Sequence, residues 1–160
     1  FYFHNKCKST VAPTFADTRC GYSPRCGDAA SYKSKQPGDL KSGKTAKYRV
    51  PSKWVGRVFN RKNKKCGKKG ENCTMGEFNL DTGSQWTPHA YDISNIQGFT
   101  QSIAMRGEGC PTVTCRTASC SCKQAYPKGD MAGKCGTNAV DQPVRACSGA
   151  NKAFRVTFCP

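Results

Sequence analysis

The stretch 77–99 contains three of the chain's ten acidic residues, in a chain whose formal net charge is +16. These are Glu77, Asp81 and Asp92. Hydrolysis of a glycosidic bond normally needs two carboxyl groups on either side of it, about 5 Å apart for retention and about 6.5–9.5 Å apart for inversion. The spacing of Glu77 and Asp92 permits them to face each other on adjacent strands of one hairpin. The alternative is that both residues have only structural roles, with Glu77 at a strand start and Asp92 as the cap of a turn.

Two histidines, His4 and His89, are further candidates for acid–base chemistry. Together with a lysine they would form the site of a secreted ribonuclease, which the basic charge would suit. The alternative is that His4 is an ordinary strand residue and that neither histidine takes part in chemistry.

Aromatic side chains could stack on sugar rings. We expect Trp86 to be the best exposed of them, because it lies in the turn beside the acidic residues. Tyr91 is a second expected contact, whereas most other aromatic residues are expected to pack in the core.

Twelve cysteines in 160 residues predict up to six disulfides in a protein of the secretory path or the extracellular space. Zinc is the other interpretation, but only Cys120 and Cys122 are close in sequence, and neither histidine is near them. We therefore expect no metal and no cofactor. No apolar stretch approaches the length of a transmembrane helix, and with no signal peptide visible we expect a mature secreted chain.

The positive charge is densest in the run RKNKKCGKK at 61–69. Such charge favours attraction to anionic surfaces, among them cell wall, acidic polysaccharide and phospholipid head groups, or it is simply a solvated surface. The chain contains no nucleic-acid-binding motif, so we expect no specific nucleic-acid partner.

Short runs that alternate apolar and polar residues fill the chain, and no window has clean helical spacing. Glycine and proline interrupt these runs, for example at Gly56, Gly83 and Pro88. The pattern predicts a single all-β domain over 1–160, a sandwich or a barrel. Residues 110–139 differ, because they are rich in cysteine and poor in apolar residues. We expect them to form a short, disulfide-stapled loop lobe outside the sheet core.

Several segments resemble, in order, those of thaumatin-like proteins, the family that includes osmotin and pathogenesis-related family 5. The segments are FHNKC at 3–7, LKSGKTAKYRVP at 40–51, GRVFNR at 56–61, TMGEFNL at 74–80, YDISNIQGF at 91–99, GCPTVTC at 109–115, VDQPVRACSG at 140–149 and FRVTFCP at 154–160. The resemblance covers most of the chain, with the family's second domain reduced.

The resemblance implies a flattened antiparallel β-sandwich with disulfide-rich loops. It also implies the bridges Cys7–Cys159, Cys66–Cys73 and Cys110–Cys147, the last joining the loop lobe to the final strand. Proximity suggests Cys20–Cys26. Four cysteines stay open: a Cys115–Cys135 bridge would match the family best but would leave Cys120 and Cys122 to form a strained bridge.

The resemblance further implies an acidic cleft associated with β-1,3-glucan binding. Glu77 matches the cleft glutamate and Asp92 its first aspartate. Gln97 stands where the second aspartate is usual, and Gly38 where an arginine is usual. The expected carbohydrate-binding residues are thus Glu77, Asp92, Gln97, Trp86 and Tyr91.

These observations predict a secreted, cationic, monomeric thaumatin-like protein that binds β-1,3-glucan or other cell-wall carbohydrate in antifungal defence or host–microbe contact. One alternative is a weak endo-β-1,3-glucanase that uses Glu77 and Asp92 as catalytic residues. Another is a cationic antifungal protein that acts on anionic membrane surfaces, or a secreted effector that binds a protein partner.

Overall fold

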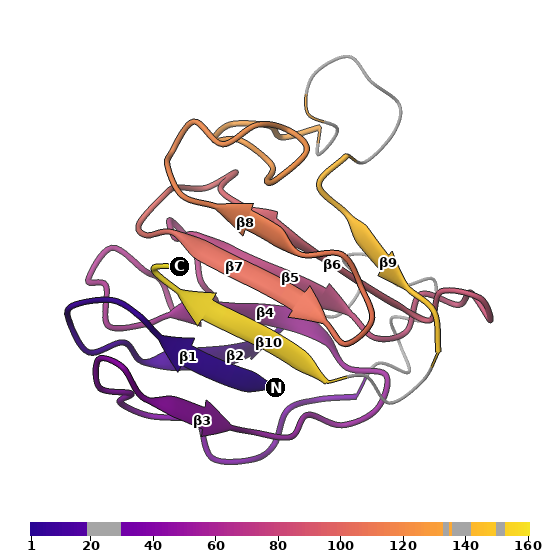
Figure 1. The fold of residues 1–160 in the computed structure, drawn as a ribbon, viewed down its shortest axis with the longest axis horizontal. Coiled ribbons are helices and arrows are strands. Elements are labelled where there is room, and N and C mark those ends of the chain that lie inside the picture. Colours follow the sequence, from indigo (N-terminus) through magenta and orange to yellow (C-terminus); the bar gives the residue numbers. More distant parts are fainter. Residues whose placement is uncertain (19–29, 133–134, 136–141, 150–152) are drawn as a thin grey trace.

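The computed structural model describes residues 1–18, 30–132, 135, 142–149 and 153–160, and these form ten strands and no helix. The first sheet has the order β3-β1-β10-β7-β8, and the second has the order β2-β4-β5-β6-β9. In Figure 1 the first sheet lies in front of the second. The strands are β1 (Tyr2–Asn5), β2 (Pro13–Asp17), β3 (Thr45–Lys47), β4 (Val55–Asn60), β5 (Met75–Asn79), β6 (His89–Ser94), β7 (Ile103–Gly107), β8 (Val113–Cys115), β9 (Arg145–Cys147) and β10 (Phe154–Phe158).

The prediction of an all-β fold is confirmed, with one correction to the strand directions. Every strand pair is antiparallel except β1 and β10, which pair in parallel with Phe3 opposite Val156. β10 comes from the end of the chain and lies between β1 and β7. A sequence pattern reports which face of a strand is buried but not which distant strand lies beside it, so this pair was not foreseen.

The core lies between the sheets because each strand turns one row of apolar side chains inward. β10 shows the alternation: Phe154, Val156 and Phe158 are buried, whereas Arg155 is exposed. Aromatic rings fill much of the core. The ring of Phe1 packs edge-on against that of Phe78 on the second sheet, with centroids 4.8 Å apart, and it also meets Trp54.

Gly56 does not interrupt a strand, as the sequence pattern suggested, but lies within β4. A Cβ atom at Gly56 would lie 2.1 Å from the indole ring of Trp54 and 2.6 Å from the carbonyl oxygen of Ala16. The position therefore needs a glycine for close approach of its neighbours, whereas Gly83, with φ of 80°, serves a turn as expected.

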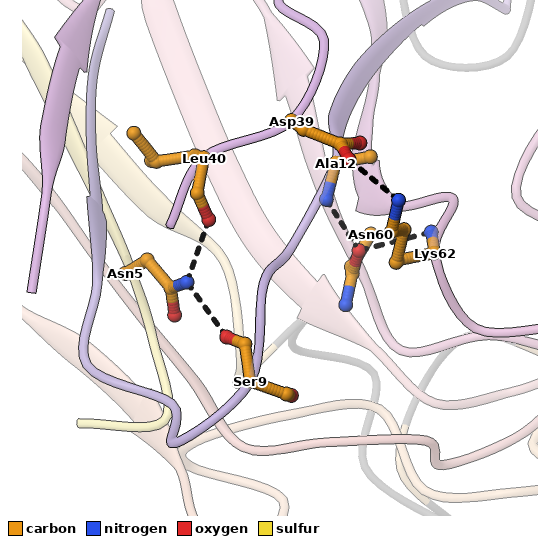
Figure 2. Close-up of polar contacts among 7 residues, drawn as sticks. All are labelled: Asn5, Ser9, Ala12, Asp39, Leu40, Asn60 and Lys62. Carbon is orange, nitrogen blue, oxygen red and sulfur yellow. Dashed lines mark hydrogen bonds and ion pairs between the residues drawn. The ribbon is translucent and has the colours of Figure 1, made fainter. Parts of the chain in front are cut away.

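Two buried asparagines hold the connections between the sheets (Figure 2). The Asn5 side-chain amide donates to the carbonyl oxygens of Ser9 and Leu40, at 2.9 and 2.8 Å. The Asn60 side-chain oxygen accepts from the backbone N–H groups of Ala12 and Lys62, at 2.8 and 3.0 Å. Several of these bonds satisfy backbone groups outside the strands, and the Leu40 carbonyl oxygen also accepts from the Val11 N–H, so the crossing from β1 to β2 has a fixed path.

The structure has the three disulfides that the resemblance implied, Cys7–Cys159, Cys66–Cys73 and Cys110–Cys147. Cys147 belongs to β9 in the second sheet rather than to the final strand, so its bridge joins that sheet to the connection between β7 and β8 of the first sheet. The four open cysteines form Cys115–Cys120 and Cys122–Cys135, which avoids the strained alternative. The suggested pair Cys20–Cys26 lies outside the described residues.

The stretch 110–139 is only partly a lobe outside the core. Its residues Val113–Cys115 form β8, the edge strand of the first sheet, and Val113, Cys115 and Ala125 are fully buried in the core cluster. The expectation that this stretch lies outside the sheet core is therefore wrong for these residues. No helix in the described part of the chain is long and apolar enough to cross a membrane.

Candidate functional site

Glu77 and Asp92 lie directly opposite each other on the neighbouring strands β5 and β6. Alternation places both on the outer face of the second sheet, because Phe78 and Tyr91 point into the core. Directly opposite residues of antiparallel strands have Cβ atoms about 4.5–5.5 Å apart, so the two carboxylates are neighbours. The hairpin arrangement that the sequence permitted is thus present.

A basic side chain completes this row. Arg57 lies opposite Glu77 on the next strand, β4, and its Nε donates to Glu77 Oε1 at 3.0 Å. Both carboxylates are buried: Glu77 is 3% exposed and Asp92 is 7% exposed. The alternative prediction, a strand start for Glu77 and a turn cap for Asp92, is wrong, because both residues lie inside strands.

The pocket next to this row is basic. It has a volume of about 740 Å³, and Arg57, Lys68 and Lys69 line it together with Asp17. The Asp17 carboxylate accepts hydrogen bonds from Trp54 Nε1 and the Tyr32 backbone N–H, at 2.8 and 2.9 Å. A general acid or nucleophile must contact the glycosidic bond. The buried carboxylates leave almost no surface for that contact, so the row resembles a cross-strand ion-pair network more than an open catalytic cleft.

The other expected carbohydrate contacts do not gather around this row. Trp86 lies in the loop 80–88 before β6, and Gln97 lies beyond the opposite end of β6. Trp86 is 76% exposed, as expected, and Gln97 is exposed too. Each could contact a ligand, but they belong to opposite ends of the hairpin.

Tyr91 is a core residue, and the expectation that it contacts carbohydrate is wrong. It is 1% exposed, and its hydroxyl donates to the carbonyl of Pro111 while accepting from the N–H of Gly107 at 3.1 Å. Burial raises the pKa of this hydroxyl above its usual value. Tyr91 therefore links β6 to β7 and the segment after it.

Sequence reasoning missed a pocket beside Trp86. This loop pocket has a volume of about 860 Å³ and lies between residues 47–53 and the loop that carries Trp86. It is lined by Phe1, Tyr2, Lys47, Tyr48, Arg49, Val50, Pro51, Ser52, Lys53, Leu80, Asp81, Thr82, Gly83, Ser84, Gln85, Pro88, His89, Ala153 and Phe154. The start of the chain, residues 47–53, the loop before β6 and residues 153–154 form it, so only the fold brings its walls together.

The loop that carries Trp86 is braced by its own hydrogen bonds. The Thr82 hydroxyl donates to the carbonyl of Thr87 at 2.6 Å. The Ser84 hydroxyl accepts from the N–H groups of Trp86 and Thr87, at 3.2 and 3.1 Å. Trp86 is therefore presented from a structured turn, which lowers the entropy cost of holding it against a ligand.

The two histidines lie on different sheets. His4 belongs to β1 of the first sheet, and His89 begins β6 of the second, where its ring packs edge-on against Phe154. This arrangement lends no support to a two-histidine ribonuclease site. No cluster of three or more potential metal ligands occurs within the described ranges.

Two five-stranded sheets packed around an aromatic core and stapled by disulfides define the fold as thaumatin-like, and the predicted resemblance to thaumatin-like proteins is confirmed. The structure of the thaumatin-like xylanase inhibitor TLXI matches with a TM-score of 0.57 and 16% identity, over 99% of this chain and 98% of that one. The protein elicitor MoHrip2 from Magnaporthe oryzae matches with a TM-score of 0.54 and 15% identity, over 99% and 97%. These identities show the fold alone.

Sequence relatives come from cereals. Pathogenesis-related protein 1A/1B of Hordeum vulgare is 34% identical over 87 residues, which are 54% of this chain and 43% of the relative. Thaumatin-like protein PWIR2 of Triticum aestivum is 33% identical over the same shares. The match thus spans less than half the length of these relatives. No protein-family model matches the chain.

Proposed function

We propose that the protein is a secreted, non-catalytic binding protein for cell-wall carbohydrate, with β-1,3-glucan as the first ligand, and that it acts in defence or host–microbe contact. The observation that carries the proposal is Trp86 beside the loop pocket. In the described ranges only Trp86 and Met131 are large hydrophobic residues with open exposure. An exposed indole on a braced turn, next to polar side chains, is suited to stacking on a sugar ring while its neighbours bind hydroxyl groups.

Two further observations support the setting of this function. The disulfides of the described part fit an extracellular protein. The names of the cereal relatives, pathogenesis-related and thaumatin-like, point to defence.

The test is binding to insoluble β-1,3-glucan, chitin and cellulose, with released sugar assayed in the supernatant. We expect retention on β-1,3-glucan without released sugar. Trp86→Ala should weaken retention about tenfold, which corresponds to about 1.4 kcal/mol. Trp86→Tyr, which keeps an exposed aromatic ring, should weaken retention on β-1,3-glucan much less. Equal binding by wild type and Trp86→Ala would contradict the assignment of the site.

The same assay decides the glucanase alternative. Sugar release that disappears in both Glu77→Gln and Asp92→Asn, with folding intact, would show that the buried row opens to substrate and acts as a catalytic pair. Sugar release that survives both substitutions would come from elsewhere.

A protein partner is the second candidate, and the exposure of Trp86 favours it too, since tryptophan is enriched at the energetic centres of protein interfaces. Two solved structures that share this fold are a thaumatin-like xylanase inhibitor and a protein elicitor. Two results together would favour this candidate. The protein would bind none of the three polysaccharides, and it would inhibit a glycoside hydrolase in a way that Trp86→Ala abolishes.

A further inference from the structure

The outer face of the first sheet carries a row of basic side chains across four strands. Lys47 on β3 pairs with Tyr2 on β1, Tyr2 with Arg155 on β10, and Arg155 with Arg106 on β7. All four point away from the core, because the next residues along β1, β10 and β7 are buried in it. We call these four residues the basic row. In Figure 1 the strands that carry it lie side by side in the front sheet.

Tyr2 organises the basic row. Lys47 Nζ lies 5.3 Å from the centroid of the Tyr2 ring, and Arg155 Cζ lies 5.2 Å from it. The two cations approach from the strands on either side of β1, and each is attracted to the ring by a cation–π interaction. The ring therefore holds two charges in place and is engaged by its own neighbours.

A row of hydroxyl groups runs beside the basic row, two residues further along each strand. Thr45 pairs with His4, His4 with Thr157, and Thr157 with Ala104. Thr114 continues the row on β8. The first row thus holds three cations around Tyr2, and the second holds three threonines with His4 and Ala104 between them. Strands are about 4.8 Å apart, so the two rows lie close together on one flat strip.

The five strands of this sheet contain no aspartate or glutamate, whereas β2, β5 and β6 of the second sheet contain Asp17, Glu77 and Asp92. The nearest carboxylate in sequence is Glu108, exposed just after β7. Lys6 and Arg116, which follow β1 and β8, add exposed positive charge. Among the described residues, the ion pairs of Glu77 and Asp39 do not involve this face, so the first sheet presents a positive field there.

From this arrangement we infer that the outer face of the first sheet binds an acidic polysaccharide, a polymer of sugars that carry carboxylate groups. The basic row would pair with the carboxylates, and the threonine row would hydrogen-bond the sugar hydroxyls. An extended strip without enclosing walls suits a polymer chain rather than a small molecule. The site does not include Trp86, and Arg106 and Arg155 do not line the loop pocket. Tyr2 and Lys47 do line it, so the strip borders the proposed glucan site and the tests below use the two arginines.

The same observations argue against two other anionic ligands. A membrane-surface site needs apolar side chains that insert among the lipids, and the two large exposed hydrophobic residues of the described part, Trp86 and Met131, lie outside these strands. Single-stranded nucleic acid is bound by stacking bases on free aromatic rings, but the Tyr2 ring is already engaged by Lys47 and Arg155.

The test uses polygalacturonate as the probe and its fully methyl-esterified form, which keeps the sugar chain but removes the charge, as the ligand control. The variant Arg106→Gln/Arg155→Gln removes two charges from the basic row. The matched control Lys64→Gln/Lys65→Gln removes two exposed charges from the 61–69 run. All variants are first compared by thermal unfolding.

We expect wild type to bind polygalacturonate and not the esterified polymer, with affinity that falls as salt rises. The double arginine variant should bind polygalacturonate at least tenfold more weakly than wild type. The double lysine control should bind within about twofold of wild type, so the two variants should differ in binding free energy by at least about 1 kcal/mol. Trp86→Ala should leave this binding unchanged, so failure here and failure of the glucan proposal are separate results.

Three outcomes would overturn the inference. Equal losses in the arginine and lysine pairs would mean that net charge alone attracts the polymer. Binding of the esterified polymer as tightly as the acid form would mean that carboxylates are not recognised. The third outcome is tighter binding to phosphatidylserine vesicles or to polyuridylate than to polygalacturonate. If the double arginine variant loses that binding, the face is assigned to lipid or to nucleic acid, respectively.

Discussion

Glu77 is flanked across the sheet by a carboxylate on one side and a guanidinium on the other, since Asp92 and Arg57 occupy the same register on β6 and β4. Like charges directly opposite each other destabilise a strand pair. The ion pair between Arg57 Nε and Glu77 Oε1 offsets this cost in a place where water has little access. The acidic hairpin therefore depends on a cation supplied by a third strand.

Arg57→Ala should be strongly destabilising, because it leaves two buried neighbouring carboxylates without the guanidinium. Breaking a buried pair by removing one partner costs about 3–5 kcal/mol, and since the Arg57 side chain is 22% exposed we expect about 3 kcal/mol. Denaturant unfolding with the disulfides intact measures the change. Arg61→Ala, at an exposed position, is the control and should change stability by less than about 0.5 kcal/mol. Similar midpoints for both variants would contradict the ion-pair network.

Gly56→Ala should destabilise the second sheet, because its Cβ would collide with the Trp54 ring and the Ala16 carbonyl oxygen. Overpacking of this kind typically costs about 1–3 kcal/mol, and with backbone as one of the obstacles we expect the upper part of that range. Gly43→Ala is the comparison, since φ there is 73° and no atom lies within 4 Å of the added Cβ. It should cost about 1 kcal/mol from backbone strain alone. A smaller loss at Gly56 than at Gly43 would show that the contact is readily relieved.

Tyr91 should make the protein sensitive to high pH. Burial raises the pKa of its hydroxyl, so the folded protein keeps this proton longer than the unfolded chain, whose tyrosines titrate near about 10. Its contribution to stability is fully present below about pH 10 and is lost as pH rises through the higher folded value. Burial also raises the pKa of Tyr32, so tyrosinate absorbance should show a late titration phase whose amplitude falls in Tyr91→Phe and falls further in Tyr32→Phe/Tyr91→Phe. Retention of the full amplitude in Tyr91→Phe would assign the late phase to other tyrosines.

The contribution of each disulfide to stability should rise with the logarithm of the length of chain that it encloses. Cys7–Cys159 spans 152 residues and Cys122–Cys135 spans 13. On the chain-entropy model the first contributes about 5 kcal/mol and the second about 3 kcal/mol. Replacing each pair by serines and comparing melting temperatures tests the order. A larger loss for the short bridge would mean that its folded-state contacts outweigh the entropy term.

Local alternation in the sequence predicted the strands well. The same alternation also contradicts part of the predicted carbohydrate site. In a strand, neighbouring residues point to opposite faces, so Tyr91 and Asp92 cannot both serve one site. The burial of Phe154, Val156 and Phe158 follows from the same period of two. By contrast, the partnership of Arg57 with Glu77 depends on the register of β4 against β5, which the 61–74 connection sets and no local pattern reports.

The basic row and the loop pocket were beyond sequence reasoning for a related reason. Lys47, Tyr2, Arg155 and Arg106 come from four strands spread over the whole chain, and they meet only because β10 inserts between β1 and β7. Positive charge spread along a sequence predicts attraction to anions, but it does not predict a strip. The order of the strands in the first sheet brings these positive charges onto one face.

The central place of β10 also has a consequence for biosynthesis. Before residues 154–158 leave the ribosome, the first sheet exists at most as two separate pairs, β3 with β1 and β7 with β8. Their inward apolar surfaces and open edges must wait for β10, while β2, β4, β5 and β6 can already pair in order. We therefore expect the nascent chain to depend on chaperones until β10 has emerged, and a ribosome stalled before β10 to hold a half-closed sandwich that aggregates on release.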